Sequence, residues 1–243
     1  MDSDPTIELS YDRAAVAYAM ALYNELSGKP LDRLLLREFA ERIQPGGLVC
    51  DAGCGPGQIA AELRSAGVDV FGVDISGAMV DAASKRNADI RFEQLDFVAT
   101  VPGTGLAGIV SFYSIVHLND ESLKHVLKNF AAALGPNGWL LLAFHTGNGV
   151  KQVDALFGVP VQLEFRFFDV GQITMCLIEA GFTVVRVVQR APYKDAEHPS
   201  QRAYILARRV AAGEPSQFVR PRDPDPFLLR LGRKVKSLLR GQK

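Results

Sequence analysis

Three glycines occupy alternate positions in the stretch "VCDAGCGPGQ", at Gly53, Gly55 and Gly57. Glycine weakens regular structure, and it is favoured where the backbone takes a positive φ angle or where a ligand approaches the main chain closely. An apolar run at 48–50 precedes the glycines, and a run with helical spacing at 59–63 follows them. The glycines are therefore expected in a strand-to-helix turn, where open α/β sheets bind their ligands.

Two carboxylates follow the next two strand-like runs. Asp74 comes at the end of "FGVD", and Asp96 comes at the end of "EQLD". The carboxyl ends of parallel strands meet at one edge of a sheet, so both acids are expected beside the glycine turn. An acid at the position of Asp74 usually binds ribose hydroxyls, and a carboxylate at Asp96 can accept a hydrogen bond from the exocyclic amine of adenine. The three strand ends therefore suit an adenosine.

The glycine spacing differs from that of a dinucleotide-binding turn. Such a turn reads G-x-G-x-x-G, which would place its third glycine at position 58, where this chain has Gln58. The third glycine of this chain comes one residue earlier. The pattern thus favours an adenosine without a phosphate, and an NAD(P)-dependent oxidoreductase is the weaker alternative.

Three side chains at later strand ends are candidate catalytic residues. Tyr113 and His117 follow the fourth strand-like run, and His145 ends the fifth. Imidazole and phenol groups can accept a proton from a reacting group when they lie within hydrogen-bond reach. The structural alternatives are that His117 caps or packs against the next helix and that His145 hydrogen-bonds a loop.

The surrounding patterns predict one α/β domain. Apolar spacing indicates helices over residues 10–24 and 31–44, and strands alternate with helices after them. Strands are expected at 48–53, 69–75, 89–96, 107–115 and 138–146, with helices at 56–67, 76–87 and 119–135. An extra strand at 161–168, a helix at 169–181 and strands at 182–191 and 201–210 follow. This order predicts a Rossmann-like, doubly wound, mostly parallel seven-stranded sheet with an antiparallel C-terminal hairpin and an N-terminal helical lid.

Composition narrows the classes of partner and location. The 243-residue chain has a formal net charge of zero and three cysteines. Zero net charge gives no general attraction to nucleic acid, and an odd number of cysteines indicates a reducing compartment, so a cytoplasmic location is expected. The first ten residues lack the apolar stretch of a signal peptide, and no apolar run is long enough to span a membrane. Cys50 and Cys54 have no second pair nearby, so no metal site is expected.

A change of composition near residue 213 suggests three segments. Residues 1–45 are expected to form an N-terminal helical cap, 46–212 the ligand-binding core, and 213–243 a linker and tail. In the tail, leucines share one helical face and basic side chains lie mainly elsewhere. Such a helix is typical of peripheral membrane contact, and docking on a protein partner or on the domain itself is the alternative.

Taken together, several motifs resemble the class I S-adenosylmethionine-dependent methyltransferases. The matching stretches are "VCDAGCGPGQ", "FGVDIS", "EQLDF", "IVSFYSIVHL" and "GF…RAYILARR", which together extend from about residue 11 to residue 209. The opening "YDRAAVAYA" is similar to a subgroup of small-molecule methyltransferases. The resemblance implies S-adenosylmethionine as cofactor and a small-molecule substrate.

The resemblance also implies which residues bind the cofactor. Asp51 and the glycine turn would contact its methionine part, Asp74 its ribose, and Asp96 with Phe97 its adenine. Tyr11 and Tyr18 lie seven residues apart on one helical face, where they would form a lid, and packing against the domain is the alternative. The implied cofactor-binding set is Tyr11, Tyr18, Asp51, Gly53, Gly55, Gly57, Asp74, Ile75, Asp96, Phe97 and Phe112.

The expected activity is methyl transfer to a small organic acceptor, with the methylated atom (oxygen, nitrogen or carbon) left open. In-line transfer requires alignment of the acceptor and exclusion of water more than it requires reactive side chains. A non-catalytic sensor of the cofactor is therefore the main alternative. The place after the fourth strand reads "SFYS" and lacks the Pro-Pro motif of nucleobase methyltransferases, which argues against nucleic acid. Residues 153–168 are expected to wall the acceptor pocket, and Arg166 is a candidate partner for an acidic group.

Overall fold

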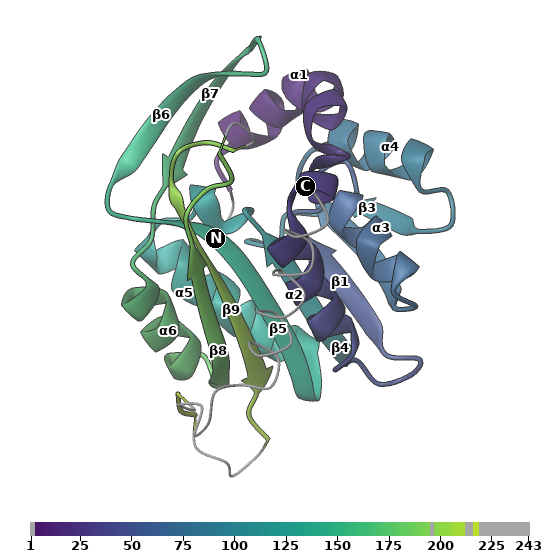
Figure 1. Cartoon of the computed structure of the whole chain (residues 1–243), viewed down its shortest axis with the longest axis vertical. Helices are drawn as coiled ribbons and strands as arrows, with labels where there is room; N and C mark the ends of the chain where they lie inside the picture. Colours follow the sequence, from purple (N-terminus) through teal and green to yellow (C-terminus); the bar gives the residue numbers. More distant parts are fainter. Residues whose placement is uncertain (1–2, 195–196, 212–215, 219–243) are drawn as a thin grey trace, which may run out of the picture.

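A computed structural model describes residues 3–194, 197–211 and 216–218 of the chain. Its main sheet has seven strands in the order β3-β2-β1-β4-β5-β9-β8, and a separate two-stranded sheet pairs β6 with β7 (Figure 1). The strands are β1 (Leu48–Ala52), β2 (Asp69–Asp74), β3 (Arg91–Gln94), β4 (Leu106–Phe112), β5 (Leu134–Thr146), β6 (Val150–Leu156), β7 (Val159–Arg166), β8 (Phe182–Arg190) and β9 (Gln201–Arg209). The helices are α1 (Pro5–Leu22), α2 (Pro30–Ala40), α3 (Gln58–Ser65), α4 (Gly77–Arg86), α5 (Asp120–Ala133) and α6 (Val170–Glu179), with short 3-10 helices η1 (Glu25–Gly28) and η2 (Ile115–His117).

The predicted Rossmann-like sheet is confirmed. Strands β1 to β5 pair in parallel, and β9 is antiparallel to both of its neighbours, β5 and β8. Successive strand residues face opposite sides of the sheet. Val49 packs in a core with α2, α3 and α4, and Cys50 packs in a core with α5 and α6. The sheet is therefore covered by helices on both faces, as a doubly wound fold requires.

Helix α1 lies across the carboxyl ends of the parallel strands, between the β6–β7 hairpin and α4 (Figure 1). It begins at Pro5, earlier than the predicted residue 10, because the Asp4 carboxylate caps it by accepting a hydrogen bond from the Thr6 N–H at 2.8 Å. The Ser10 hydroxyl hydrogen-bonds the main chain of Gln162 in β7. The N-terminal helix is thus tied directly to the hairpin.

The hairpin corrects the prediction of one extra strand at 161–168. Strand β6 was missed because its "VKQVDAL" does not alternate regularly between apolar and polar residues; in the structure it exposes most of its residues and has no buried apolar face. Phe157 and Gly158 join β6 to β7, both with positive φ, at 50° and 81°. Two-residue hairpin turns of this kind normally carry asparagine or glycine first, so Phe157 holds a strained position.

Two further boundaries differ from the sequence-based prediction. Strand β3 ends at Gln94, so Asp96 lies in the segment beyond the strand. Helix α5 ends at Ala133 and β5 begins at once, because Gly135 and Pro136 are poor helix residues. The pairing of β4 with β5 shifts register between Leu106 and Gly108, because β5 has more residues than β4 over this stretch.

The predicted linker and tail at 213–243 lie outside the described residues except for 216–218. There the Gln217 carbonyl accepts a hydrogen bond from the Val184 N–H at 2.9 Å, so this piece runs beside β8. Among the described helices, none is both long enough and apolar enough to cross a membrane. The same part of the chain contains no group of three or more metal-ligating side chains.

Candidate active site

The glycine turn between β1 and α3 has the conformation that its sequence predicts. Gly53, Gly55 and Gly57 have φ angles of 77°, 51° and 88°, in the left-handed region. A Cβ atom on Gly53 would lie 2.3 Å from the Cβ of Ser114, closer than packed atoms can approach. The turn is held against β2, since the N–H groups of Gly53 and Cys54 both donate to the Val73 carbonyl. Only glycine fits this combination of φ angle and packing.

Asp74 links the glycine turn to the start of α4. One carboxylate oxygen accepts from the Gly55 N–H at 2.8 Å, and the other accepts from the Ser76 N–H at 3.0 Å. Burial raises the pKa of Asp74 to about 6, against the opposing effect of these two N–H donors. Each oxygen has a second lone pair, so Asp74 can still accept hydroxyl donors from the cavity that it lines.

Asp51 lies below the turn, where it binds the first turn of α3. One carboxylate oxygen accepts from the Ala60 N–H at 3.0 Å, and the other is buried with no hydrogen-bond partner among the described residues. Burial raises the pKa of Asp51 to about 8. A buried carboxylate oxygen without a donor is costly, so a donor from a bound group would lower the free energy of this site.

A cavity of about 370 Å³ opens above these residues, and we call it the first cavity. It brings together nine of the eleven predicted cofactor-binding residues: Tyr11, Tyr18, Gly53, Gly55, Asp74, Ile75, Asp96, Phe97 and Phe112. Asp51 and Gly57 are not among its lining residues; Gly57 instead packs closely against Asn87 and Phe92. Sequence reasoning missed Met79, Ser122 and the N-terminal Ser3, Asp4 and Ile7, which also line this cavity.

The N-terminal segment reaches into the first cavity at Asp96. The backbone N–H and the hydroxyl of Ser3 donate to the two oxygens of Asp96, at 2.8 and 2.9 Å. The Val98 N–H donates to the same carboxylate at 2.8 Å. Asp12 of α1 adds a second contact, since its carboxylate accepts from the Ser76 hydroxyl at 2.6 Å. Helix α1 and the residues before it therefore close the first cavity from above.

A second cavity, of about 620 Å³, adjoins the first. The two cavities share six lining residues: Tyr11, Tyr18, Gly53, Gly55, Phe112 and Tyr113. The β6–β7 hairpin forms one wall of the second cavity, and residues of η1 and of the β8–β9 connection also line it. The ring of Phe157 at the hairpin tip meets Tyr18 edge-on, with centroids 5.6 Å apart, so the hairpin and α1 touch over the junction.

Tyr113 lies at the junction with its hydroxyl in a buried polar network. The hydroxyl is 2.9 Å from that of Tyr204, which donates to Asp32 at 2.8 Å. Burial raises the pKa of Tyr113 well above its usual range. Tyr113 has a φ angle of 55°, an unusual value for an aromatic residue, so its position is set by the surrounding contacts.

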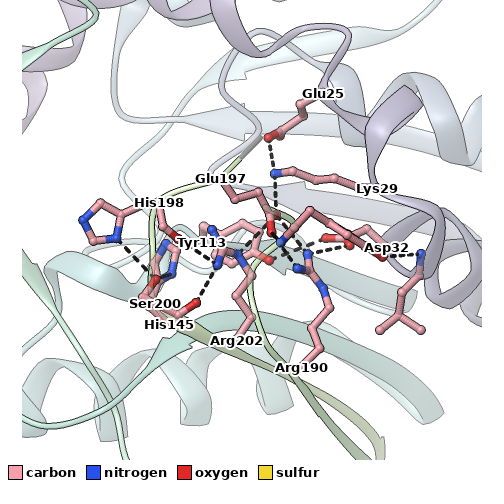
Figure 2. Close-up of polar contacts among 12 residues, drawn as sticks. Glu25, Lys29, Asp32, Tyr113, His145, Arg190, Glu197, His198, Ser200 and Arg202 are labelled. Atoms are coloured by element: carbon pink, nitrogen blue, oxygen red, sulfur yellow. Dashed lines mark hydrogen bonds and ion pairs between the residues drawn. The ribbon is translucent and has the colours of Figure 1, made fainter. Parts of the chain in front are cut away.

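An ion-pair network that no local sequence pattern indicated continues from this point (Figure 2). Arg190 donates to both oxygens of Glu197, at 2.6 and 2.9 Å, and to Asp32 at 2.9 Å. Lys29 and Arg202 each lie 3.2 Å from Glu197. Burial raises the pKa of Glu197, but the hydrogen bonds from Arg190 and from the Tyr193 N–H, together with the positive charges of Lys29 and Arg190, outweigh that effect and hold the pKa at about 2. The network ties the β8–β9 connection to α2 beneath the second cavity.

His117 lies at the first cavity, with both ring nitrogens engaged. The Glu164 carbonyl can only accept, so the Nδ1 of His117, 3.0 Å away, carries the proton. The Nε2 therefore accepts from the Tyr11 hydroxyl at 2.8 Å. Burial lowers the pKa of His117 to about 4, so the ring is neutral at pH 7.

His145 lines the second cavity, stacked beside Tyr113 with ring centroids 4.9 Å apart. Its Nδ1 lies 2.9 Å from the Ser200 hydroxyl. Burial lowers its pKa to about 4. Arg166 pairs instead with Glu164 at 3.6 Å, and it lines neither cavity.

A sequence profile for a methyltransferase domain matches residues 23–187, which is more than half of the chain. The chain belongs to this family. The predictions of a methyltransferase, of its Rossmann-like fold and of S-adenosylmethionine as the cofactor are thereby confirmed.

Curated relatives match part of this methyltransferase chain. It is 32% identical over 111 residues to an uncharacterized methyltransferase of Oceanobacillus iheyensis, covering 44% of the chain and 50% of that protein. It is 31% identical over 140 residues to the malonyl-[acyl-carrier protein] O-methyltransferase of Enterobacter lignolyticus, covering 58% and 53%. The chain thus spans about half the length of the curated relatives that it matches.

The fold of the methyltransferase extends over more of the chain than the sequence likeness does. The structure of magnesium protoporphyrin IX methyltransferase from Synechocystis, with bound S-adenosylmethionine, has a TM-score of 0.63 at 19% identity. The match covers 86% of this chain and 98% of that one. At this identity, the likeness supports the fold alone.

Proposed function

We propose that this protein transfers the methyl group of S-adenosylmethionine to a small-molecule acceptor, with the cofactor in the first cavity and the acceptor in the second. The observation that carries this proposal is the junction of the two cavities at Gly53, Gly55, Phe112 and Tyr113, beneath Tyr11 and Tyr18. A methyl group can pass between two bound molecules only where their sites meet. The O-methyltransferase among the curated relatives named above supports methyl transfer as the reaction.

The first cavity has suitable partners for each part of the cofactor. Asp74 would accept from the ribose hydroxyls, and Asp96 would accept from the adenine amine in place of Ser3. The unpartnered oxygen of Asp51 and the close-packed Gly53 would face the methionine end, directly or through water. When bound, the cofactor supplies an electrophilic methyl group on a sulfonium.

The residues of this chain would align the acceptor and exclude water. We propose that residues 1–45 act as a lid, because α1 contacts both the hairpin and α4 and because Tyr18 meets Phe157 over the junction. Desolvation and alignment together can supply much of the acceleration of an in-line transfer.

Tyr11 and His117 are the candidate route for a proton. Tyr11 lines both cavities, and its hydroxyl donates to the Nε2 of His117. A proton leaving the acceptor would reach the Tyr11 oxygen while the phenolic proton moves to Nε2. Tyr113 is a weaker candidate, since its hydroxyl is already engaged by Tyr204. His145 lines the second cavity, where it would bind the acceptor.

Two measurements test the proposal. Calorimetric titration of the full chain should show saturable binding of S-adenosylhomocysteine and none of NAD. Incubation with methyl-labelled S-adenosylmethionine and a metabolite extract should place the label in a small molecule. Binding without any labelled product would favour a sensor, and absence of binding would refute the proposal.

A further inference from the structure

The inner face of the β6–β7 hairpin carries one charge. Strand residues alternate between faces, so Lys151, Val153 and Ala155 point into the second cavity, and Phe165 points in from β7. The charged residues at the intervening positions, Asp154, Glu164 and Arg166, are absent from the cavity lining. Lys151 is therefore the one charged side chain that the hairpin directs into an otherwise apolar wall.

The acids of the second cavity are already neutralised by other cations. Glu197 is bound by Arg190, Arg202 and Lys29, and Glu25 pairs with Lys29 at 2.5 Å. Lys151 has no carboxylate within 4.0 Å among the described residues, and its recorded partner is His198, 2.8 Å away. The lining residues thus include three cations and two acids, which leaves one positive charge unmatched at Lys151.

A directed chain of hydrogen bonds leads inward from Lys151 (Figure 2 shows its inner members). An ammonium group can only donate, so the Nε2 of His198 accepts and its Nδ1 carries the proton. That Nδ1 faces the Ser200 hydroxyl at a long 3.5 Å, and the hydroxyl is free to donate to the Nδ1 of His145 at 2.9 Å. His145 then carries its own proton on Nε2, for which no partner is recorded among the described residues. Two donors, the Lys151 ammonium and the His145 Nε2–H, are thereby left for a molecule in the cavity.

We propose that the acceptor bound in the second cavity is an amphiphilic anion, with a carboxylate-like group held by Lys151 and His145 and an apolar body lying on the hairpin. This inference rests on the proposed methyltransferase function and narrows its substrate class. Lys151 and His145 line the second cavity alone, so the anionic group lies outside the junction and is an anchor, distinct from the methylated atom. His145 is half-buried and Lys151 is exposed in this structure, so a bound molecule that covers both side chains would strengthen these charge-assisted hydrogen bonds by excluding water.

A pair of fluorescent probes that differ in one charge tests the anchor. 8-Anilinonaphthalene-1-sulfonate carries an anion on an aromatic body, and N-phenyl-1-naphthylamine is its neutral counterpart. Both would be titrated into the full chain with S-adenosylhomocysteine at saturation, so that the first cavity is filled. We expect the anionic probe to bind about tenfold more tightly than the neutral one, which is the effect of one charge-assisted contact.

Substitutions then assign that preference to Lys151. Lys151→Met keeps the length of the side chain and should reduce the preference for the anionic probe to about twofold or less, while Lys151→Arg should retain it. Lys128→Met removes an exposed lysine of α5, away from both cavities, and is the matched control. Equal binding of the two probes by the unaltered chain, or an unchanged preference in Lys151→Met, would overturn the inference.

An extract experiment links the anchor to the substrate and separates the two proposals. Passing the metabolite extract over an anion-exchange resin before the labelling reaction should remove the methyl acceptor, and the labelled product should itself bind that resin. An acceptor that passes through the resin would refute the anionic anchor and leave the methyltransferase proposal standing. Failure to bind S-adenosylhomocysteine would instead refute the proposed function.

Discussion

The two cavities are built in different ways. The first takes its glycine turn and the acids Asp74 and Asp96 from one stretch, between Gly53 and Asp96, where three successive strands end. The second takes residues from η1, the hairpin and the β8–β9 connection, which lie far apart in the sequence. The first therefore follows from the order of strands in the sheet, whereas the second depends on long-range contacts. The difference suggests that the fold determines cofactor binding, whereas the segments attached to it determine which acceptor is bound.

The largest effect is expected from Glu197→Gln, beneath the second cavity. This change leaves Arg190, Lys29 and Arg202 without their shared carboxylate, and breaking a buried ion pair costs about 4 kcal/mol. Urea unfolding of the variant should show a loss of that size, and Glu179→Gln on the exposed face of α6 should change stability by less than about 0.5 kcal/mol. Equal stability of the two variants would mean that the network is not what supports this cavity.

The same residue predicts a pH dependence. The folded state holds the pKa of Glu197 at about 2, below its usual value of 4.5, so its charge stabilises the fold above pH 4.5. That contribution should be lost as the pH falls from 4.5 towards 2. Glu197→Gln should lack this part of the pH dependence, as measured by urea unfolding at each pH.

The next largest effect is expected at Asp74, in the first cavity. Asp74→Ala should weaken the binding of S-adenosylhomocysteine roughly 100-fold, equivalent to about 2.8 kcal/mol, because the ribose loses its charged acceptor. Asp69→Asn, at the exposed start of the same strand, is the control. In the unaltered chain, affinity should be constant above pH 6 and fall below it, because protonation at a pKa of about 6 removes the carboxylate. Calorimetry that shows full affinity at pH 5 would contradict this role.

A smaller effect is expected from the glycine turn. Gly53→Ala would place a Cβ 2.3 Å from Ser114 and should lower cofactor affinity about tenfold as the turn shifts. Gly67→Ala is matched in its positive φ of 86°, but it faces open space at the end of α3. It should cost about 1 kcal/mol of stability and leave affinity unchanged. If both variants bind the cofactor equally well, the close approach at Gly53 has no role in binding.

The smallest effect is expected at the hairpin tip. Phe157→Asn suits the left-handed turn better and should raise stability by about 0.5 kcal/mol, while the edge contact with Tyr18 is lost. We expect methyl transfer to slow several-fold with cofactor affinity unchanged, measured by labelled transfer and calorimetry. Transfer at the full rate would show that the strained phenylalanine does not contribute to closure.

The sequence predicted the first cavity well and the second poorly, for physical reasons. The glycine spacing and the acids at strand ends are local signals, and nine of the eleven cofactor-binding residues that the family resemblance implied line one cavity. Asp51 was placed correctly on its strand, but its contact with Ala60 depends on where α3 begins. In the second cavity, His145 was identified from its strand end and the apolar stretch 153–168 from its composition.

The remaining parts left no local signal. Strand β6 lacks regular apolar alternation and is mostly exposed, so neither the hairpin nor the inward direction of Lys151 could be predicted from periodicity. The ion-pair network joins charged residues that, from the sequence alone, would be expected on the protein surface. Ser3 gave no indication that it would reach Asp96, 93 positions away. Such contacts exist only once the topology of the sheet has brought the segments together.

The ion pair between Asp32 and Arg190 spans 158 positions. While the chain is being synthesised, α2 emerges early with an aspartate whose cationic partner has yet to be made. The buried hydroxyl partner Tyr204 arrives later still. The ribosome must therefore release nearly the whole domain before this acid can be desolvated without penalty, so α2 should dock after translation of β9, in one of the last steps of folding.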